Sequence, residues 1–303
     1  MTLETPAVSR PRGGPVPLLR ALRPRQWLKN LLVFIPMLAG HAISSESMLQ
    51  SLAAFATFCM CASSAYLLND ALDASHDRLH KTKRHRPMAA GTLSLRAGLI
   101  ASALLALAAL LAAAQQSSAF FTALLVYFCA TLLYSFFLKR LMGLDVLVLA
   151  SLYVMRIVGG GAATGIDPSV WLLAFSFFLF LGLALLKRHS ELADLLASGK
   201  VDVPGRGYST SHTRVVGVLG MLASVCAALV FVLYIGSATV AQMYPHRLRL
   251  WFAVPMLLAW LARLWTLSYQ RRIHEDPLFF VSKDPVSLAL IAACVGAVVA
   301  AAR

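Results

Sequence analysis

Acidic residues are scarce in this chain. Asp and Glu together number 13 of 303 residues, against 27 Lys and Arg, and charged residues of both signs make up only 13% of the sequence. Soluble domains carry about 25% charged residues, whereas 59% of this chain is hydrophobic. The composition therefore excludes an ordinary soluble domain and predicts an all-α, polytopic membrane protein. The formal charge of +14 is typical of basic loops at a membrane surface, and we expect no nucleic-acid partner.

Cysteine is also rare, and several motifs are missing. The five cysteines lie inside apolar segments without a Cys-x-x-Cys spacing, which favours packing roles over disulfides or zinc. There is no Walker loop, no dinucleotide-binding Gly-x-Gly-x-x-Gly and no Gly-x-Ser-x-Gly elbow, so nucleotide hydrolysis is not predicted. The first 26 residues lack the apolar core of a cleavable signal peptide, and we expect the first membrane helix to direct insertion.

Apolar runs of about 20 residues, the length needed to cross the hydrocarbon of a bilayer, recur along the chain. Residues 1–24 are predicted to form a cytoplasmic tail, and residues 25–303 a transmembrane helical domain. Only Gln115 to Ser118 separate the third and fourth runs, which predicts a tight helical hairpin. We expect nine spans, at about residues 27–43, 49–70, 97–114, 118–138, 144–163, 169–187, 213–237, 249–268 and 285–302.

Lys and Arg gather in alternate loops of this scheme. The opposite loops hold only Arg247 and Arg249, with Arg303 at the carboxyl end. Cytoplasmic loops of membrane proteins carry the excess of Lys and Arg. We therefore expect a bacterial-type cytoplasmic membrane protein with its amino terminus in the cytoplasm and its carboxyl terminus outside.

Three of the scarce acids fall within the eight positions from Asp70 to Asp77, between two apolar runs. Asn69, Asp73 and Asp77 are spaced by four, so on a helix they would share one face. An ordinary polar loop would explain the polarity but not this spacing. Carboxylates this close repel each other, and a hard cation relieves that repulsion. The pattern predicts a site for Mg²⁺, with Mn²⁺ as the alternative ion, whose remaining ligands would be water and substrate phosphates.

Two further groups of polar residues lie near or inside apolar runs. One group, at the end of the sixth run, comprises Lys187, Arg188 and Glu191. These residues would either form a simple ion pair or supply two cations that bind a phosphate. Arg156 lies about three turns inside the fifth run, and a lipid-facing charge there would cost about 2.5 to 3.5 kcal/mol. It must therefore face a polar cavity or a partner, and Asp145 is too far along the same helix to pair with it.

These segments resemble those of the UbiA prenyltransferase superfamily. The first signature of that superfamily is similar to Asn69-Asp70-x-x-Asp73-x-x-x-Asp77 followed by Lys83 and Arg86-Pro87. Four other segments look like the decaprenyl-phosphate phosphoribosyltransferase branch, namely Pro24-Arg25-Gln26-Trp27-x-Lys29-Asn30, Tyr134-Ser135-x-x-x-Lys139, Arg156-x-x-x-Gly160 and Lys187-Arg188-x-x-Glu191-Leu192. The resemblance covers nearly the whole chain.

The resemblance implies a nine-helix bundle with a cytoplasmic-facing cavity that holds a magnesium-bound diphosphate. In this branch 5-phosphoribosyl 1-diphosphate is the donor and a polyprenyl phosphate the acceptor. Relatives that prenylate aromatic acids carry a second Asp-x-x-x-Asp after the sixth helix, where this chain has Lys187, Arg188, Glu191 and Asp194 instead. That departure favours a donor with an additional phosphate held by cations.

The residue patterns and the resemblance together define an expected site. Catalysis is assigned to Asn69, Asp70, Asp73 and Asp77, and metal binding to Asn69, Asp73 and Asp77. Substrate binding is assigned to Lys29, Asn30, Lys83, Arg86, Tyr134, Lys139, Arg156, Lys187, Arg188, Glu191, Arg206 and Tyr208. The expected partners are a polyprenyl lipid, a diphosphate-bearing donor and the membrane, and the sequence leaves a homo-oligomer open.

Two other functions fit parts of the pattern. A prenyltransferase would move a polyprenyl group from its diphosphate to an aromatic acceptor, and aromatic side chains would then face the allylic cation. The candidates for such a lining are Phe55, Phe58, Tyr66, Phe177 and Phe180. An anion transporter would use Arg156 to bind its substrate, but the chain shows no convincing internal repeat.

Overall fold

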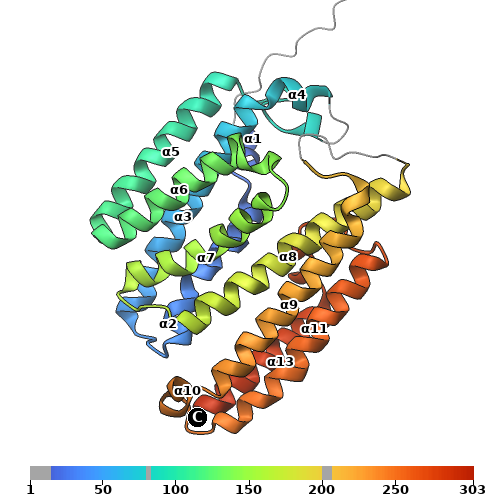
Figure 1. Cartoon of the computed structure of the whole chain (residues 1–303). Helices are drawn as coiled ribbons and strands as arrows, with labels where there is room; N and C mark the ends of the chain where they lie inside the picture. The colour runs from blue at the N-terminus through green and yellow to red at the C-terminus, as the bar shows by residue number, and fades with distance from the viewer. Residues whose placement is uncertain (1–14, 80–82, 200–206) are drawn as a thin grey trace, which may run out of the picture. The chain divides into compact units, whose positions relative to one another are not determined.

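The computed structural model describes residues 15–79, 83–199 and 207–303 (Figure 1). Within these ranges the regular structure is entirely helical, as the composition predicts. The chain divides into two compact units. The first comprises residues 1–135 and 156–167, and the second comprises residues 136–155 and 168–303. Helix α7 (Leu144–Thr164) contributes its first half to the second unit and its second half to the first.

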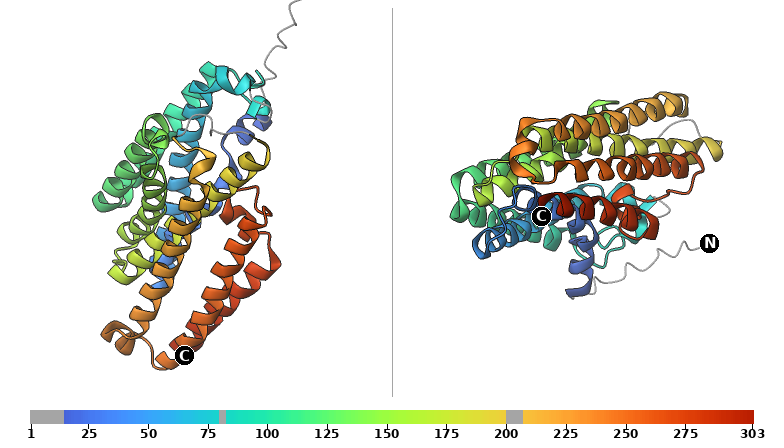
Figure 2. Two further views of the ribbon diagram at one scale, coloured as in Figure 1. Left: turned by 45° about the vertical axis from the view of Figure 1, so that its right-hand side comes forward. Right: turned by 90° about the horizontal axis from the view of Figure 1, so that it is seen from below.

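The first unit holds the amino-terminal helices, coloured blue to green in Figures 1 and 2. Its elements are α1 (Pro15–Ala21), the 3-10 helix η1 (Pro24–Phe34), α2 (Ile35–Ala39), α3 (Ser45–Leu72), α4 (Ala74–Leu79), the 3-10 helix η2 (Lys83–His85), α5 (Leu95–Gln116) and α6 (Ser118–Phe136). Helices α3 and α5 lie side by side. Buried Ser64 and Ser102 join them, because each hydroxyl donates to the other residue's carbonyl oxygen, at 2.9 and 2.8 Å.

The second unit is built mainly from long helices, coloured yellow to red in Figure 2. After the first half of α7 come α8 (Val170–Ala197), α9 (Thr213–Ile235), α10 (Ala238–Met243), α11 (Ala253–Tyr269), α12 (Pro277–Val281) and α13 (Pro285–Ala302), with the 3-10 helices η3 (Leu138–Arg140), η4 (Thr210–His212) and η5 (Arg247–Phe252) between them. The most extensive contacts are those of α8 with α9 and of α11 with α13.

Eight helices in the described part of the chain are long and apolar enough to cross a membrane. The first of the nine expected spans differs in form, because residues 27–43 do not form one long α-helix. They fall mainly in η1 and α2, and Phe34 and Ile35 keep right-handed helical dihedrals where the two meet. Eleven residues of 3-10 helix followed by five of α-helix reach roughly 30 Å, which is about the thickness of the hydrocarbon core.

Serine side chains begin several of the long helices. Ser44 and Ser47 form a reciprocal capping box at the start of α3. Ser94 and Ser169 accept hydrogen bonds from backbone N–H groups in the first turns of α5 and α8. Ser117 alone separates α5 from α6, and its hydroxyl accepts from the N–H of Phe120. The predicted tight hairpin between the third and fourth runs is therefore confirmed.

Candidate functional site

The acidic cluster lies in the first unit, where α3 gives way to α4. Asp73 caps the carboxyl end of α3, and its N–H donates to the carbonyl oxygen of Asn69 at 2.9 Å. The N–H of Asp77 in turn donates to the carbonyl oxygen of Asp73 at 2.8 Å. The helical hydrogen-bond pattern thus continues through the break. The spacing of four therefore places these three residues along one helical path, as the sequence indicated.

Two arginines neutralise the buried members of this cluster. Arg86 Nη1 contacts Asp70 Oδ1 at 3.2 Å and Asp77 Oδ2 at 2.7 Å, and Arg23 Nη2 contacts Asp70 Oδ1 at 2.6 Å. The carboxylates are almost fully buried, whereas both arginine side chains remain more than a quarter exposed. These acids are therefore not the unpaired carboxylates that the sequence suggested. The sequence marked Arg86 as a substrate residue, and the structure places it at an ion pair.

Arg23 is a residue that sequence reasoning missed as part of the site. It adopts a left-handed backbone conformation with φ of 55° immediately before η1, and a residue with a Cβ does so at an energetic cost. Its guanidinium also lies over the ring of Tyr66, 5.0 Å from the centroid. The only signal in the sequence was the Arg-Pro pair at the start of the first apolar segment, which does not indicate a partner 47 positions away.

The oxygen donors of the cluster suit a hard divalent cation. Asn69 donates through Nδ2 to Ser135 Oγ at 2.9 Å, so Oδ1 is the atom that Asn69 offers to a cation. Asp73 and Asp77 add carboxylate oxygens. The described residues contain no group of three His, Cys, Asp or Glu side chains placed to hold a metal. Mg²⁺ usually takes one or two protein carboxylates and completes its octahedron with water and phosphates.

Arg156 is buried in the first unit among polar partners. Its Nε donates to Asn30 Oδ1 at 2.9 Å, and its Nη2 donates to Tyr127 Oη at 2.7 Å. Close approach of η1 depends on Gly160, because a Cβ there would lie 2.0 Å from the carbonyl oxygen of Val33. Arg156 therefore faces polar partners and not lipid, as the free-energy cost of a lipid-facing charge led us to expect. Its contacts join α7 to η1 and α6, and the predicted roles of Arg156 and Asn30 at substrate stay predictions.

A second polar centre, in the second unit, surrounds Arg188. Arg188 Nε contacts Asp145 Oδ2 at 2.8 Å, and its Nη1 pairs with Glu191. Tyr208 Oη donates to Asp145 Oδ1 at 2.6 Å and accepts from the N–H of Gly143 at 3.0 Å. Burial raises the pKa of Tyr208, and its hydrogen bond to Asp145 raises it further. Arg188 and Asp145 are 2% and 0% exposed, so the network holds the start of α7 against α8 and the segment at Tyr208.

Lys187 lies on the wall of a small pocket in the second unit. Its Nζ contacts Asp276 Oδ2 at 3.3 Å. The pocket has a volume of about 230 Å³ and is also lined by Ser190, Glu191, Asp194 and His274. Its walls thus carry both signs of charge. The sequence pointed to Lys187 and Glu191 but gave no reason to include residues 274–276, which lie between α11 and α12.

The remaining predicted residues are distributed over both units. Lys29 lies in η1, Lys83 in the exposed turn η2, and Tyr134 precedes Ser135, the hydrogen-bond partner of Asn69. Lys139 belongs to η3 in the second unit. Arg206 lies outside the described residues. The acidic cluster therefore gathers Asn69, Asp70, Asp73, Asp77 and Arg86 in the first unit, and the second unit gathers Lys187, Arg188, Glu191 and Tyr208.

Comparison with known proteins gives consistent matches over most of the chain. The family model described as the UbiA prenyltransferase family matches residues 33–301. Nodulation protein NoeC of Azorhizobium caulinodans is 34% identical over 275 residues, covering 89% of this chain and 88% of that protein. Decaprenyl-phosphate phosphoribosyltransferase of Mycolicibacterium smegmatis is 32% identical over 303 residues, covering 98% of this chain and 95% of that enzyme.

Two further comparisons bear on length and fold. Protein y4nM of Sinorhizobium fredii is 33% identical over 271 residues, and this chain spans 52% of the length of that relative. A UbiA homolog from Archaeoglobus fulgidus, solved with GPP and Mg²⁺, superposes with a TM-score of 0.67 at 18% identity. The superposition covers 93% of this chain and 99% of the other. At that identity the likeness establishes the fold.

Proposed function

Because this chain belongs to the UbiA prenyltransferase family and is a membrane transferase of that family, we propose that it transfers 5-phosphoribose from 5-phosphoribosyl 1-diphosphate to a polyprenyl phosphate. The near end-to-end match to the M. smegmatis phosphoribosyltransferase supports this assignment. The observation that carries it is the Lys187 pocket, in which a cation stands beside carboxylates at the end of α8. A phosphate group is bound by a cation such as Lys187. Carboxylates are suitable hydrogen-bond acceptors for ribose hydroxyls.

The acidic cluster and the Lys187 pocket have distinct tasks in this proposal. Asn69, Asp73 and Asp77 hold a divalent cation, which when bound places positive charge against the leaving diphosphate. Arg86 keeps the carboxylate of Asp77 oriented through its 2.7 Å contact. In the second unit, Lys187 binds a phosphate oxygen, and Glu191 and Asp194 accept hydrogen bonds from ribose hydroxyls.

The reaction requires no protein nucleophile. An oxygen of the lipid phosphate attacks C1 of the ribose, while the bond between C1 and the diphosphate oxygen breaks. The diphosphate departs with the bonding electron pair, and the products are polyprenyl phosphoribosyl phosphate and diphosphate. The acceptor oxygen is already anionic, so no general base is needed. The protein contributes by positioning both substrates and by stabilising the leaving charge.

The distribution of Lys and Arg among the loops indicates how the protein is oriented in the membrane. The acidic cluster and the Lys187 pocket lie in or next to the loops rich in Lys and Arg, which we infer to be cytoplasmic. Phosphoribosyl diphosphate is water-soluble and would reach the site from that side. Reporter tags test this arrangement. A tag at the amino terminus should respond as cytoplasmic and one at the carboxyl terminus as external, whereas both ends on one side would require an even number of crossings.

Mass spectrometry of lipids tests the reaction directly. The purified protein in liposomes is incubated with polyprenyl phosphate, phosphoribosyl diphosphate and Mg²⁺. We expect a lipid heavier than the acceptor by one phosphoribosyl group, and none when the donor is omitted or when EDTA is present. Full activity in EDTA would remove the metal from the proposal. Failure to form this product under conditions in which prenyl transfer is detected would remove phosphoribosyl transfer.

Prenyl transfer is the second candidate, because the A. fulgidus homolog that shares the fold was solved with GPP and Mg²⁺. In that case the lipid itself would carry the diphosphate. A parallel incubation with a polyprenyl diphosphate and 4-hydroxybenzoate, a simple aromatic acid, distinguishes the two. A prenylated aromatic product, formed without any need for phosphoribosyl diphosphate, would select this alternative.

A further inference from the structure

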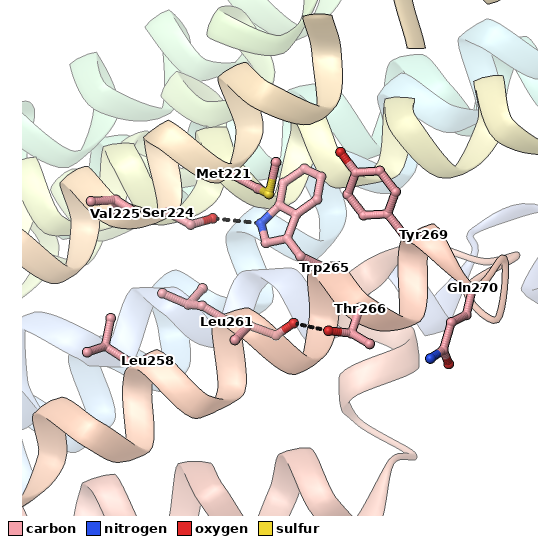
Figure 3. A pocket seen from close by; sticks show the side chains of 10 residues that line it. Met221, Ser224, Val225, Leu258, Leu261, Trp265, Thr266, Tyr269 and Gln270 are labelled. Carbon is pink, nitrogen blue, oxygen red and sulfur yellow. Dashed lines mark hydrogen bonds between the residues drawn. The ribbon is translucent and has the colours of Figure 1, made fainter. Parts of the chain in front are cut away.

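An apolar groove runs along α9 and α11 in the second unit (Figure 3). Its volume is about 630 Å³, which lies in the range of pockets that hold one small organic ligand. Met221 and Val225 line it from α9, and Leu258, Leu261 and Trp265 line it from α11. Both helices are membrane-crossing candidates. The groove is therefore built for hydrocarbon rather than for a water-soluble ligand.

Glycines on α9 and aromatic rings on α11 shape one end of the groove. A Cβ on Gly220 would lie 2.3 Å from the ring of Trp265, and one on Gly217 would lie 2.6 Å from the hydroxyl of Tyr269. Trp265 is fixed further by its Nε1, which donates to Ser224 Oγ at 3.0 Å, as Figure 3 shows. These rings therefore form a rigid wall at the end of the groove that Tyr269 occupies.

Tyr269 also lines a second cavity, of about 550 Å³, so the two cavities adjoin at this residue. The second cavity differs in chemistry. Its lining includes Arg214, Arg271 and the hydroxyl-bearing residues Thr210 and Ser211, and no Asp or Glu belongs to the part of the lining that the structure describes. Arg214 precedes Met221 and Val225 by seven and eleven positions, so all three share one face of α9. An apolar groove thus leads to a cationic end.

Arg271 reaches this cavity from an unusual backbone position. Its φ is 56°, and it stands where helices most often place glycine after their last turn. The N–H of Arg271 donates to Ser268 O at 3.0 Å, and that of Arg272 donates to Leu267 O at 2.9 Å, which together close the helix end. Glycine would adopt this backbone conformation after α11 at a lower energetic cost than arginine does. The arginine side chain, and not the turn, is therefore the feature that requires explanation.

We propose that this groove binds a phospholipid of the surrounding bilayer with an anionic head group. One acyl chain lies along Met221, Leu258 and Trp265, and the head-group phosphate binds Arg214 and Arg271. Basic pockets between membrane helices are suited to anionic head groups, and guanidinium binds phosphate with two parallel hydrogen bonds. A single groove of this volume suits an acyl chain better than a long polyprenyl chain. The bound lipid would act as a structural partner of the α9 and α11 pair.

Lipid competition on the full-length protein tests the proposal. The protein in nanodiscs of phosphatidylcholine is titrated with phosphatidylglycerol, and native mass spectrometry counts the lipids retained. Arg271→Gly is the central variant, since glycine suits this backbone position and cannot disrupt the turn. We expect Arg271→Gly and Arg214→Gln each to weaken phosphatidylglycerol retention about tenfold. Arg272→Gln removes the neighbouring cation, which does not line the cavity, and should leave retention unchanged.

A steric variant tests the groove separately from its charge. Ala262 lines the groove, so Ala262→Phe should expel the acyl chain and lower retention of phosphatidylglycerol while both arginines remain. Leu222→Phe, on an exposed part of α9 outside the lining, is its matched control. Equal retention by the wild type and all variants would overturn the proposal. Displacement of phosphatidylglycerol by an equimolar amount of polyprenyl phosphate would also overturn it, by assigning the groove to the acceptor lipid.

Discussion

The two polar centres use the same residue types under opposite conditions of burial. At the acidic cluster the carboxylates are buried, and the side chains of Arg23 and Arg86 are 28% and 27% exposed. At the second centre the side chain of Arg188 is itself 2% exposed, and that of Asp145 is fully buried. The arginines of the first centre keep part of their surface open to water and to a substrate phosphate, whereas Arg188 is closed off from both. We infer that the first centre is available for chemistry and that the second is a structural lock.

The largest effect should come from breaking the buried ion pair between Arg188 and Asp145. Arg188→Ala leaves Asp145 buried without its cation, and such a change typically costs about 3 to 5 kcal/mol of stability. Unfolding in mixed micelles of increasing SDS content measures it. Lys187→Ala, one position away at a partly exposed pair, should cost less than about 1 kcal/mol.

A paired replacement makes this prediction sharper. The double variant Asp145→Leu and Arg188→Leu removes both charges from the buried site, and the stability should recover most of the loss, because Glu191 can turn towards water. If Arg188→Ala were as stable as the wild type, Arg188 would not be a lock, and its assignment as a substrate cation would regain support.

The next largest effect should be on activity at the first centre. Asp73→Asn replaces a carboxylate by an amide, a poorer ligand for a hard dication. We expect product formation to fall at least a hundredfold, equivalent to about 2.7 kcal/mol, with little change in stability. Asp77→Asn should lose activity similarly, but it also breaks the contact with Arg86.

The matched control lies at the other end of the same helix. Glu46 is an exposed acid in the first turn of α3, and Glu46→Gln should leave both activity and stability unchanged. Rates are measured over a range of Mg²⁺ concentrations. If the metal interpretation is correct, Asp73→Asn should require more Mg²⁺ for half-maximal rate. A loss of activity that no Mg²⁺ concentration relieves, together with loss of folded protein, would instead place Asp73 among the structural residues.

The third prediction concerns Lys187, whose side chain is 34% exposed and thus more open to solvent than the arginines of either centre. If Lys187 holds a donor phosphate, Lys187→Ala should raise the KM for phosphoribosyl diphosphate by about ten- to a hundredfold, because charge-assisted contacts are worth roughly 1.5 to 3 kcal/mol. The KM for the lipid should change much less. Asp276→Asn breaks the same ion pair from the other side and retains a residue suited to cap α12. Equal KM changes in both variants would show that only the ion pair matters.

The sequence revealed the two centres to different degrees, and the reason is the distance between partners along the chain. The spacing of Asn69, Asp73 and Asp77 is local, so helical periodicity alone was enough to group them. Arg188 bonds Asp145 across 43 positions, and Arg156 bonds Asn30 across 126. Burial and charge cost required partners for these arginines, but no periodicity identifies partners on other elements.

The first membrane segment illustrates a second limit of the sequence. Hydropathy over residues 27–43 correctly marked an apolar stretch, but it does not distinguish a 3-10 helix from an α-helix. The 3-10 form of η1 is coupled to packing, since the carbonyl of Val33 lies where a side chain on Gly160 would be. In contrast, the turn between α5 and α6 was predictable because Ser117 both ends one helix and caps the next.

The smallest effect should come from a third ion pair, between Arg263 and Asp284, whose carboxylate at 12% is more exposed than the paired aspartates of the two centres. Asp284 caps α13, and its carboxylate pairs with Arg263. Burial by itself raises the pKa of Asp284, but hydrogen bonds from Arg263 and Ser287 outweigh it and hold that pKa below its usual value. The stabilisation is therefore fully present above the usual aspartate pKa, near 3.9, and is lost as the pH falls through the folded-state pKa.

Asp284→Asn keeps a good capping residue and removes only the charge. We expect a loss of no more than about 1 kcal/mol at pH 7, and a difference from the wild type that shrinks as the pH is lowered towards 3. Thermal unfolding at both pH values measures this. A loss as large as that of Arg188→Ala would mean that exposure of the arginine does not decide the strength of these pairs, and the distinction between a chemical and a structural centre would then have to rest on kinetics alone.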